Sequence, residues 1–313
     1  MFSFDLQRFA VISDVPGSGW NILITARDLA TSNRNGLMSQ ADKAKLDSIY
    51  YSWVFGFKIK KNESDPETRV EYTDDCTDFE PLRVNLSTGD VNWGSWENSP
   101  IINSFRPVAL KYDGTVDYEL DHNDHTKKLD GTASDVSDIN YAGNFMVGVK
   151  KLYFCCYEDS DYYYCKVSNY PQNSFYHCYA HIDNNGIEKD EVYLPMFEGT
   201  KDSSNRLRSV AGKTPCYTTG GAANEIAWAK NNGSGWYIDD FSNSKMIENL
   251  TILLTKSCHF QDTIGVGFTC GSWNNKWEGQ STGTMLNKGM FYGTSHNTVS
   301  TMTGVKLFYL ENY

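Results

Sequence analysis

The sequence lacks the features that place a chain in a membrane or on a nucleic acid. It has no run of the roughly eighteen apolar residues that a membrane-spanning helix needs, and its first residues, MFSFDLQRFA, lack the basic, hydrophobic and small-residue order of a signal peptide. Basic residues are scarce, because 28 Lys and Arg stand against 39 Asp and Glu, for a formal net charge of -11. Nucleic-acid binding depends on clustered Lys and Arg. We therefore expect a soluble protein made in the cytoplasm, with no membrane insertion and no nucleic-acid partner.

The sequence shows no clear motif for phosphate binding, dinucleotide binding or glycoside cleavage. There is no phosphate-binding G-x-x-x-x-G-K. The segment GVGFTCG at residues 265–271 has no clear parallel strand before it and no helix after it, which a dinucleotide site requires. No pair of carboxylates suited to glycoside cleavage stands out among the 39 acidic residues. The sequence predicts no enzyme, no catalytic residues and no cofactor.

One loop crowds residue types that bind metals, namely Asp121, His122, Asp124 and His125. Two histidines three apart beyond a strand converge only on a helical turn, and no remote third ligand is evident. His177 and His181 lie four apart in a strand-like segment, so they point to one side, again without a third partner. We interpret the first group as solvated loop residues and the second as hydrogen-bonded sheet residues, and predict no metal site.

The cysteines are Cys76, Cys155, Cys156, Cys165, Cys178, Cys216, Cys258 and Cys270. They include no C-x-x-C pair, and a chain of 313 residues does not depend on disulfides. We expect free thiols. A pair such as Cys258 and Cys270 forms only if their strands lie side by side.

Aromatic residues make up 14% of the chain, and Gly, Asn, Ser and Thr are abundant, a composition that favours strands and turns. Alternation typical of strands begins with YYSWVFGFKIKK and RVEYTDD. The clearest hairpin is FRPVALKYDGTVDYELD, with Asp113 and Gly114 in its turn. Residues 143–168 indicate two long strands around EDSD, and residues 176–194 another pair around Gly186. These patterns predict a twisted antiparallel sheet.

Two helical patterns stand out between residues 224 and 268. Asn224 caps the first, and Asn232 and Gly233 end it. The second begins near residues 242–244 and carries an apolar stripe of Met246, Ile247, Leu250, Leu253 and Leu254. We predict that both helices lay their apolar sides on the sheet.

The loops leave alternatives open. Trp93 and Trp96 are either exposed binding residues or anchors that pin a long loop to the body. Arg206 and Arg208 tie loops through their forked donors, or Arg208 pairs with an internal carboxylate. From residue 265 onward Gly, Asn, Ser, Thr and aromatic residues predominate, a composition that both recognition loops and plain surface loops use.

The first 49 residues differ from the rest. FSFDLQRFA is a short amphipathic piece, and VPGSGWNI interrupts the chain with Pro16, Gly17 and Gly19. GLMSQADKAKLDSI starts like a capping box at Ser39 and Asp42 and predicts a helix of about three turns, which is marginal alone. The segment is either a flexible tail or a peptide that folds when it docks on a larger assembly. We predict two parts, residues 1–49 and residues 50–313.

Several motifs resemble those of phage structural proteins. FSFDLQRFA resembles the N-termini of structural proteins of phages from Gram-positive bacteria, and GLMSQADKAKLDSI is similar to a motif of phage head and tail fibres. Over residues 50–313, the runs SDPETRVEYTDD, LKYDGTVDYELDHNDHTKKLDGT, LRSVAGKTP, AKNNGSGWY and LNKGMFYGTS occur in the order seen in phage fibre proteins with a C-type-lectin-like domain. That fold is related to the variable proteins of diversity-generating retroelements and to the formylglycine-generating-enzyme fold.

The resemblance implies an α+β fold: a β-rich C-type-lectin-like domain with two helices packed on a twisted antiparallel sheet, preceded by a short virion-docking peptide and helix. It places the ligand surface on C-terminal loops, at Ser272, Trp273, Asn274, Asn275, Lys276, Trp277, Tyr292, Ser295, His296 and Asn297. The docking residues are Phe4, Leu6, Phe9, Leu37, Met38, Leu46 and Ile49. His122 and His125 stand where the family pattern has Pro and Tyr, which argues further against a metal site.

The function that follows is a non-enzymatic virion fibre or spike. Its N-terminal part docks on capsid or tail proteins, and its C-terminal domain attaches to a host cell-surface glycan or protein, with a homotrimer implied by the resemblance. The alternative is a structural head fibre or capsid decoration protein without a dedicated receptor. A third reading, a polysaccharide depolymerase, would release oligosaccharides from the host envelope.

Overall fold

The computed structural model describes residues 52–66, 68–183, 185–216, 221–266, 281–295 and 304–311. By its contacts the chain divides into two units, Met1–Trp53 and Val54–Tyr313, and almost all described residues belong to the second. The predicted docking module, residues 1–49, lies outside the described residues. The same holds for its predicted docking residues, Phe4, Leu6, Phe9, Leu37, Met38, Leu46 and Ile49.

The described chain consists mainly of strands with few helices. Its strands are β1 (Val54–Lys60), β2 (Val70–Asp74), β3 (Arg83–Val84), β4 (Val91–Asn92), β5 (Phe105–Lys111), β6 (Val116–Glu119), β7 (Gly143–Lys150), β8 (Tyr153–Glu158), β9 (Tyr162–Ser168), β10 (Glu191–Pro195), β11 (Thr200–Lys201), β12 (Leu207–Arg208), β13 (Lys306–Leu307) and β14 (Leu310–Glu311). Its α-helices are α2 (Ala222–Lys230), α3 (Phe241–Thr255) and α4 (Phe260–Thr263), and its 3-10 helices are η1 (Ile102–Ser104) and η2 (Tyr179–His181). This is a β-rich α+β fold, as the composition predicted.

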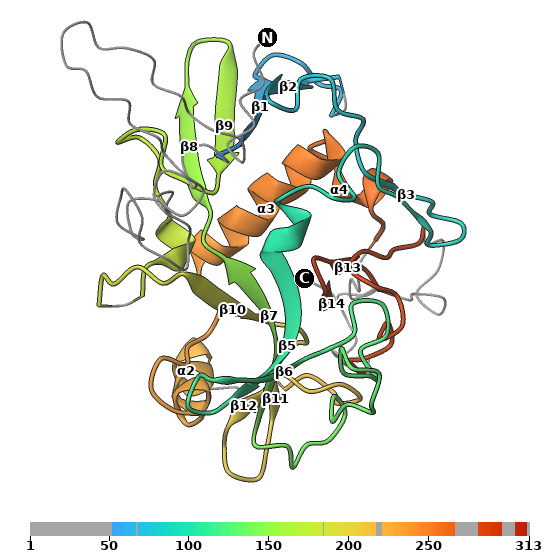
Figure 1. Cartoon of the computed structure of the whole chain (residues 1–313), viewed down its shortest axis with the longest axis vertical. Coiled ribbons are helices and arrows are strands. Elements are labelled where there is room, and N and C mark those ends of the chain that lie inside the picture. The colour runs from blue at the N-terminus through green and yellow to red at the C-terminus, as the bar shows by residue number, and fades with distance from the viewer. Residues whose placement is uncertain are drawn as a thin grey trace, which may run out of the picture. The chain divides into compact units, whose positions relative to one another are not determined.

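The longer strands form two antiparallel four-stranded sheets, in the orders β2-β1-β9-β8 and β10-β7-β5-β6 (Figure 1). The predicted hairpin is confirmed as β5 and β6. Gly114 takes a φ of 83° in its turn, a conformation that only glycine adopts at no steric cost. The Asp113 carboxylate accepts a hydrogen bond from the Thr115 N–H at 2.9 Å, which closes the turn.

The segment predicted as two long strands, residues 143–168, contains three, because the chain changes sheet inside it. β7 pairs with β5 and β10 in one sheet, whereas β9 pairs with β1 and β8 in the other. At the change, the Lys151 N–H donates to the Asp190 carbonyl at 2.8 Å, and its ammonium lies 2.9 Å from the Asp190 carboxylate. The next residue, Leu152, is fully buried. Strand-like residues lie on both sides of Lys150 and Lys151, so side-chain spacing did not reveal that the two strands join different sheets.

Helix α3 is the central helix of the unit, and it lies between the two four-stranded sheets in Figure 1. The Asp240 carboxylate caps it by accepting a hydrogen bond from the Asn243 N–H at 3.0 Å. Lys256 ends it in the left-handed region, with a φ of 51°. The predicted stripe is confirmed, and every residue from Met246 to Thr255 except Glu248 is buried. Burial on this scale requires protein on more than one side of the helix.

Helix α2 begins at Ala222 after Gly221, two residues before the predicted cap. Asn224 therefore lies inside the helix rather than at its end. α2 packs on β12, whereas α3 contacts β1. The structure thus sets the two helices against different strands, where the sequence predicted one shared sheet.

Trp96 and Arg208 act as anchors. Trp96 is fully buried, with its ring centroid 4.9 to 5.9 Å from those of Phe55, Tyr72 and Phe79, so it pins its loop to the body.

Arg208 is 2% exposed and fulfils both predicted roles. Its guanidinium donates to the carbonyls of Ile139 (2.8 Å), Tyr141 (2.7 Å) and Gly143 (2.6 Å). It also lies 3.2 Å from the Asp202 carboxylate. One buried cation therefore binds three carbonyls of residues 139–143 and one carboxylate.

Candidate functional site

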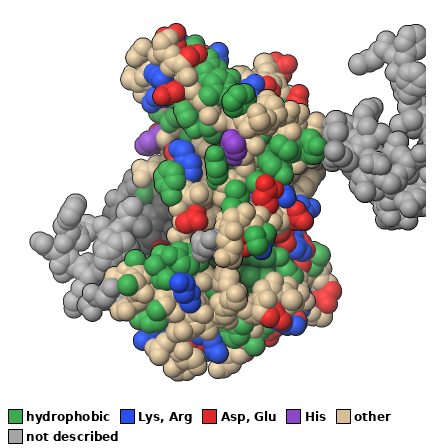
Figure 2. All heavy atoms as spheres, turned by 90° about the vertical axis from the view of Figure 1, so that its left-hand side faces the viewer, with side chains coloured by type: hydrophobic (Ala, Val, Ile, Leu, Met, Phe, Trp, Pro, Cys, Tyr) green, Lys and Arg blue, Asp and Glu red, His purple; other side chains and the backbone are tan. Residues whose placement is uncertain are grey.

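A groove of about 930 Å³ lies beside strand β8. Such a volume lies in the range of small-ligand sites, about 300–1,000 Å³. We call it the aromatic groove and define it by its aromatic lining residues, Phe154, Tyr157, Tyr163, Phe175, Tyr176, Tyr179 and Phe241. β8 and the start of α3 lie on the left in Figure 1, and Figure 2 looks onto that side, where hydrophobic side chains reach the surface among charges of both signs.

Four aromatic rings of the groove are exposed to solvent. Phe241 is 81% exposed, Phe175 72%, Tyr179 63% and Tyr157 47%. Large apolar side chains that gather at the surface around a cavity mark binding surfaces, whereas single ones scattered over a protein need no explanation. The ring of His177 stacks on that of Tyr179, with 5.0 Å between centroids, and extends this rim.

Backbone pairing holds the outer wall of the groove in place. β8 is the edge strand of its sheet. Beyond it, Phe154 and His177 exchange two backbone hydrogen bonds of 2.8 and 2.9 Å. The segment that carries Phe175 and Tyr176 is thereby fixed along β8, and Phe241 reaches the groove from the first turn of α3.

One buried polar group at the groove lacks a partner. Asn249 of α3 is 4% exposed, and its Oδ1 atom accepts no hydrogen bond from any described residue. Its Nδ2 atom has only a weak contact, 4.0 Å to the Cys156 Sγ. Leaving a buried acceptor unsatisfied costs about 1–3 kcal/mol, so this atom needs an explanation.

The other polar groups of the groove are paired or neutral. Lys166 lies 2.8 Å from Asp74, and Lys245 2.9 Å from Glu248. Burial raises the pKa of Tyr176 to about 12, so its hydroxyl keeps its proton at neutral pH and can donate. The groove is therefore a site for a ligand with apolar faces and a few hydrogen-bonding groups, not for a strongly charged one.

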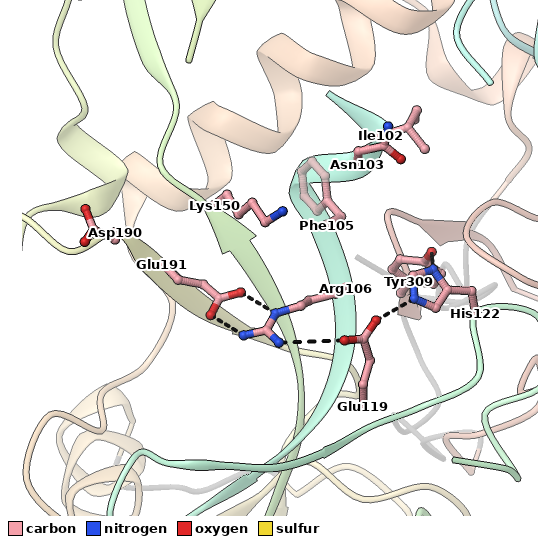
Figure 3. Close-up of a pocket in the computed structure, with 10 residues that line it drawn as sticks. All are labelled: Ile102, Asn103, Phe105, Arg106, Glu119, His122, Lys150, Asp190, Glu191 and Tyr309. Carbon is pink, nitrogen blue, oxygen red and sulfur yellow. Dashed lines mark hydrogen bonds and ion pairs between the residues drawn. The ribbon is translucent and has the colours of Figure 1, made fainter. Parts of the chain in front are cut away.

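A second, polar cleft of about 510 Å³ lies on the β10-β7-β5-β6 sheet (Figure 3). The Arg106 guanidinium donates two hydrogen bonds of 2.6 Å to the Glu191 carboxylate and lies 3.7 Å from the Glu119 carboxylate. Glu119 in turn lies 2.7 Å from the His122 Nε2, whose Nδ1 is 2.9 Å from the Tyr309 hydroxyl. The main charged groups of this cleft are thus already joined to one another.

The electrostatics of the cleft agree with a structural role. Burial opposes the charged form of Glu191, but hydrogen bonds from Arg106 and Tyr193 outweigh it and hold the pKa of that carboxyl below its usual value. Because Arg106 on β5 binds carboxylates from β6 and β10, the network ties three strands of one sheet. We therefore take the aromatic groove, not this cleft, as the candidate functional site.

The predicted solvated histidine loop is partly wrong. His125 is fully buried, and its Nδ1 lies 3.0 Å from the ammonium of Lys306. Burial, and then the neighbouring Lys306, lower the pKa of His125 well below its usual value. His122 belongs to the polar cleft. Within the described ranges, no three His, Cys, Asp or Glu side chains gather as metal ligands would.

The predicted strand containing His181 is also wrong. His181 lies in η2 and is fully buried, where its Nε2 accepts a hydrogen bond from the Leu152 N–H at 3.4 Å. Burial lowers its pKa to about 4. The side chain is a neutral acceptor for a backbone donor at the point where the chain leaves β7.

A G-x-S-x-G sequence spans residues 279–283, the pattern of a nucleophile elbow. That elbow requires a strand before the Ser and a helix after it. Residues 281–295 contain no helix, and Ser281 is exposed. The context for a nucleophilic serine is therefore missing in the described residues.

Most of the predicted ligand surface lies outside the described residues: Ser272, Trp273, Asn274, Asn275, Lys276, Trp277, His296 and Asn297. The two remaining members, Tyr292 and Ser295, line neither cavity. Tyr292 pairs through its backbone with Lys306, and the Ser295 N–H donates to the Leu86 carbonyl at 3.0 Å. The sequence analysis did not single out Phe175, Phe241 or Asn249. For Phe241 the available signal was an aromatic residue directly after Asp240, the residue that caps α3.

No family model, curated protein or solved structure matches this chain. Among the described helices, none is long and apolar enough to cross a membrane.

Proposed function

We propose that this chain is a bacteriophage fibre or spike protein that attaches to the host surface by holding a saccharide in the aromatic groove. The phage assignment rests on the sequence motifs at the N-terminus and along residues 50–313, and a C-type-lectin-like fold is the form of α+β domain those motifs imply. The saccharide assignment rests on the groove. The observation that carries it is a ring of exposed aromatic side chains around a buried acceptor without a donor.

The chemistry of the groove suits a sugar better than a charged ligand. A pyranose has C–H faces that lie flat on aromatic rings, and Phe175, Tyr179 and Phe241 offer such rings at the rim. Its hydroxyl groups can both donate and accept. A donor would satisfy the Asn249 amide oxygen, which removes the desolvation penalty that this atom carries in the free protein.

The amide must turn to meet the ligand. Its oxygen is covered by protein atoms, and the contact that orients its nitrogen, to Cys156, is weak. A rotation about the Cβ–Cγ bond therefore brings the oxygen toward the cavity at little cost. We expect the free and bound proteins to differ in this torsion more than in the backbone.

A single groove of this kind binds weakly, so attachment relies on several copies. Fibres present their domains together, and linked sites convert later contacts into intramolecular events. We propose a homotrimer as the unit, with the C-terminal loops around Trp273 and Trp277 as a further contact surface. Docking on the capsid or tail is assigned to residues 1–49.

The proposal is tested by replacing Phe241 with Ala in the full-length protein. A Phe side chain has about 200 Å² of surface, and 81% of Phe241 is exposed. A sugar that covers half of the exposed part removes about 80 Å² from water, which is worth about 2 kcal/mol at about 25 cal/mol per Å². We expect an affinity for host-wall oligosaccharide about thirtyfold lower by calorimetry, with an unchanged melting temperature because so little of the ring is buried.

Leu129→Ala is the matched control, since Leu129 is 58% exposed and does not line the groove. It should leave binding intact. If Trp273→Ala and Trp277→Ala abolish host binding while Phe241→Ala does not, the receptor surface is on the C-terminal loops and the groove assignment is wrong. If none of these variants changes adsorption and the wild-type protein does not compete with phage for host cells, only a structural decoration role remains.

A further inference from the structure

Two cysteines face each other across strands β8 and β9. Cys156 and Cys165 are register partners in this antiparallel pair, so their side chains point to the same face of the sheet. Their sulfur atoms lie 3.2 Å apart. Both thiols are free, and a disulfide between them needs a two-electron oxidation and a shortening of this contact to about 2.05 Å.

The hydrogen-bond pattern shows that the backbone suits a disulfide at this position. The Asp159 N–H donates to the Tyr162 carbonyl at 3.0 Å, which makes these residues a hydrogen-bonded pair. Hydrogen-bonded and non-hydrogen-bonded pairs alternate along an antiparallel ladder. Three residues further along, Cys156 and Cys165 are therefore a non-hydrogen-bonded pair.

A second observation also assigns Cys156 and Cys165 as a non-hydrogen-bonded pair. Phe154, two residues before Cys156, exchanges both of its backbone hydrogen bonds with His177 on the outer side of β8. Phe154 is therefore not hydrogen-bonded to β9, and neither is Cys156. Non-hydrogen-bonded partners have Cα atoms about 4.5 Å apart, within the range of about 4.4–6.8 Å that disulfides span.

The two thiols differ in access. Cys156 is exposed and lines the aromatic groove, whereas Cys165 is fully buried beneath it. A reagent from solution meets Cys156 first, and the buried partner is already in position to complete the reaction.

We propose that Cys156 and Cys165 form a redox-active thiol pair that low-molecular-weight disulfides convert to a cross-strand disulfide. The Cys156 thiolate attacks one sulfur of the reagent, which gives a mixed disulfide and releases one thiolate. The Cys165 sulfur then attacks the Cys156 sulfur and displaces the second thiolate, and the released thiolates take up the two protons lost by the cysteines. Two protein thiols and one reagent disulfide thus give one protein disulfide and two reagent thiols.

The surroundings favour Cys156 as the attacking group. A hydrogen bond from the Cys165 thiol lowers the pKa of Cys156 to about 7, and the hydroxyl of Tyr163 assists; the protein atoms around the sulfur, which shield it more than the rest of this exposed residue, oppose the shift. The ammonium of Lys245 adds a smaller contribution in the same direction. Burial raises the pKa of Cys165, which keeps that thiol protonated until the mixed disulfide forms.

The test uses the reduced full-length protein and oxidised glutathione. We expect peptide mapping by mass spectrometry to find Cys156 linked to Cys165, with two thiols lost per chain. Cys155→Ser is the matched control, because the adjacent residue points to the opposite face and its loss should not prevent the link. A link between Cys156 and any other cysteine, or two thiols that stay open to alkylation after oxidation, would overturn the proposal.

Single variants separate the two steps. Cys165→Ser should trap glutathione on Cys156, and Cys156→Ser should leave Cys165 at least about tenfold slower to react, because it is buried. If Cys165→Ser does not fold, the linkage map of the wild-type protein decides alone. These readouts do not involve a saccharide, so the thiol pair and the proposed receptor function stand or fall separately.

Discussion

Replacing Asn249 by Leu separates stability from binding, because the two effects have opposite signs. Leu has the same number and branching of heavy atoms as Asn but no polar atom to satisfy. The Asn249 oxygen has no partner among the described residues, so its removal should recover about 1–2 kcal/mol, and the higher helix propensity of Leu adds a few tenths of a kcal/mol. For a unit of this size, each kcal/mol corresponds to about 2–4 °C in melting temperature.

The same change should weaken saccharide binding about tenfold, since the ligand loses one hydrogen bond in a desolvated site. Thermal unfolding measures the first effect, and calorimetry with host-wall oligosaccharide the second. Thr251→Val is the control on the same helix, because its hydroxyl already donates to the Ile247 carbonyl at 2.7 Å; it should lower stability slightly and leave affinity unchanged. A lower melting temperature for Asn249→Leu would show that the amide has a structural partner, and an unchanged affinity would show that the ligand does not use it.

Three further predictions concern the fold. Arg208→Leu should lower the free energy of unfolding by about 3–5 kcal/mol in urea titrations, because it removes a buried donor from each of three carbonyls and the closer of the two arginines from Asp202; Arg206→Ala, on a half-buried neighbour, should cost under about 1 kcal/mol. Asp240→Ala should cost about 1 kcal/mol through the lost cap of α3, seen as a lower melting temperature. Burial lowers the pKa of Lys306 from 10.5 to about 7, so between pH 7 and 9 the unfolded chain binds more protons and wild-type stability should rise with pH, whereas Lys306→Met should lack that rise. The lowered pKa of His125 acts in the same direction at acid pH, and stability should fall as the pH drops below about 6.5.

Local patterns in the sequence were enough for the elements that fold on themselves. The β5–β6 hairpin follows from alternation on both sides of Asp113 and Gly114, and α3 from apolar residues at helical spacing. In both cases the signal lies within about fifteen residues, where backbone preference and burial agree.

Sheet membership was not predictable, because strand pairing is a contact between distant segments. Nothing in the residues around Lys151 and Leu152 states that β7 continues in one sheet and β8 in the other. The same limit explains the histidines. His125 is buried by Lys306, which follows it by 181 positions, and no local spacing reports such a partner. The loop looked solvated only because its cover comes from the other end of the chain.

The groove was missed for a related reason: its walls come from β8, β9, the segment before η2 and the first turns of α3. The predicted ligand surface was a compositional inference about one segment. A site assembled from four separate segments leaves no distinctive composition in any one of them. The sequence alone could have raised one question, namely why an aromatic residue, Phe241, stands at the start of a helix. The structure shows that Phe241 is exposed there and contributes little to folding.

The buried polar residues of α3 give the strongest reason to place function at the groove. Thr251 and Thr255 satisfy their hydroxyls inside the helix, by donating at 2.7 Å to the carbonyls four residues before them. Asn249 is equally buried and leaves its acceptor without a donor among the described residues. A leucine there would remove that penalty and would add apolar contacts. Since Asn249 leaves a buried acceptor unsatisfied and its residue lines the aromatic groove, we take a ligand with a hydroxyl donor as the physical reason for its presence.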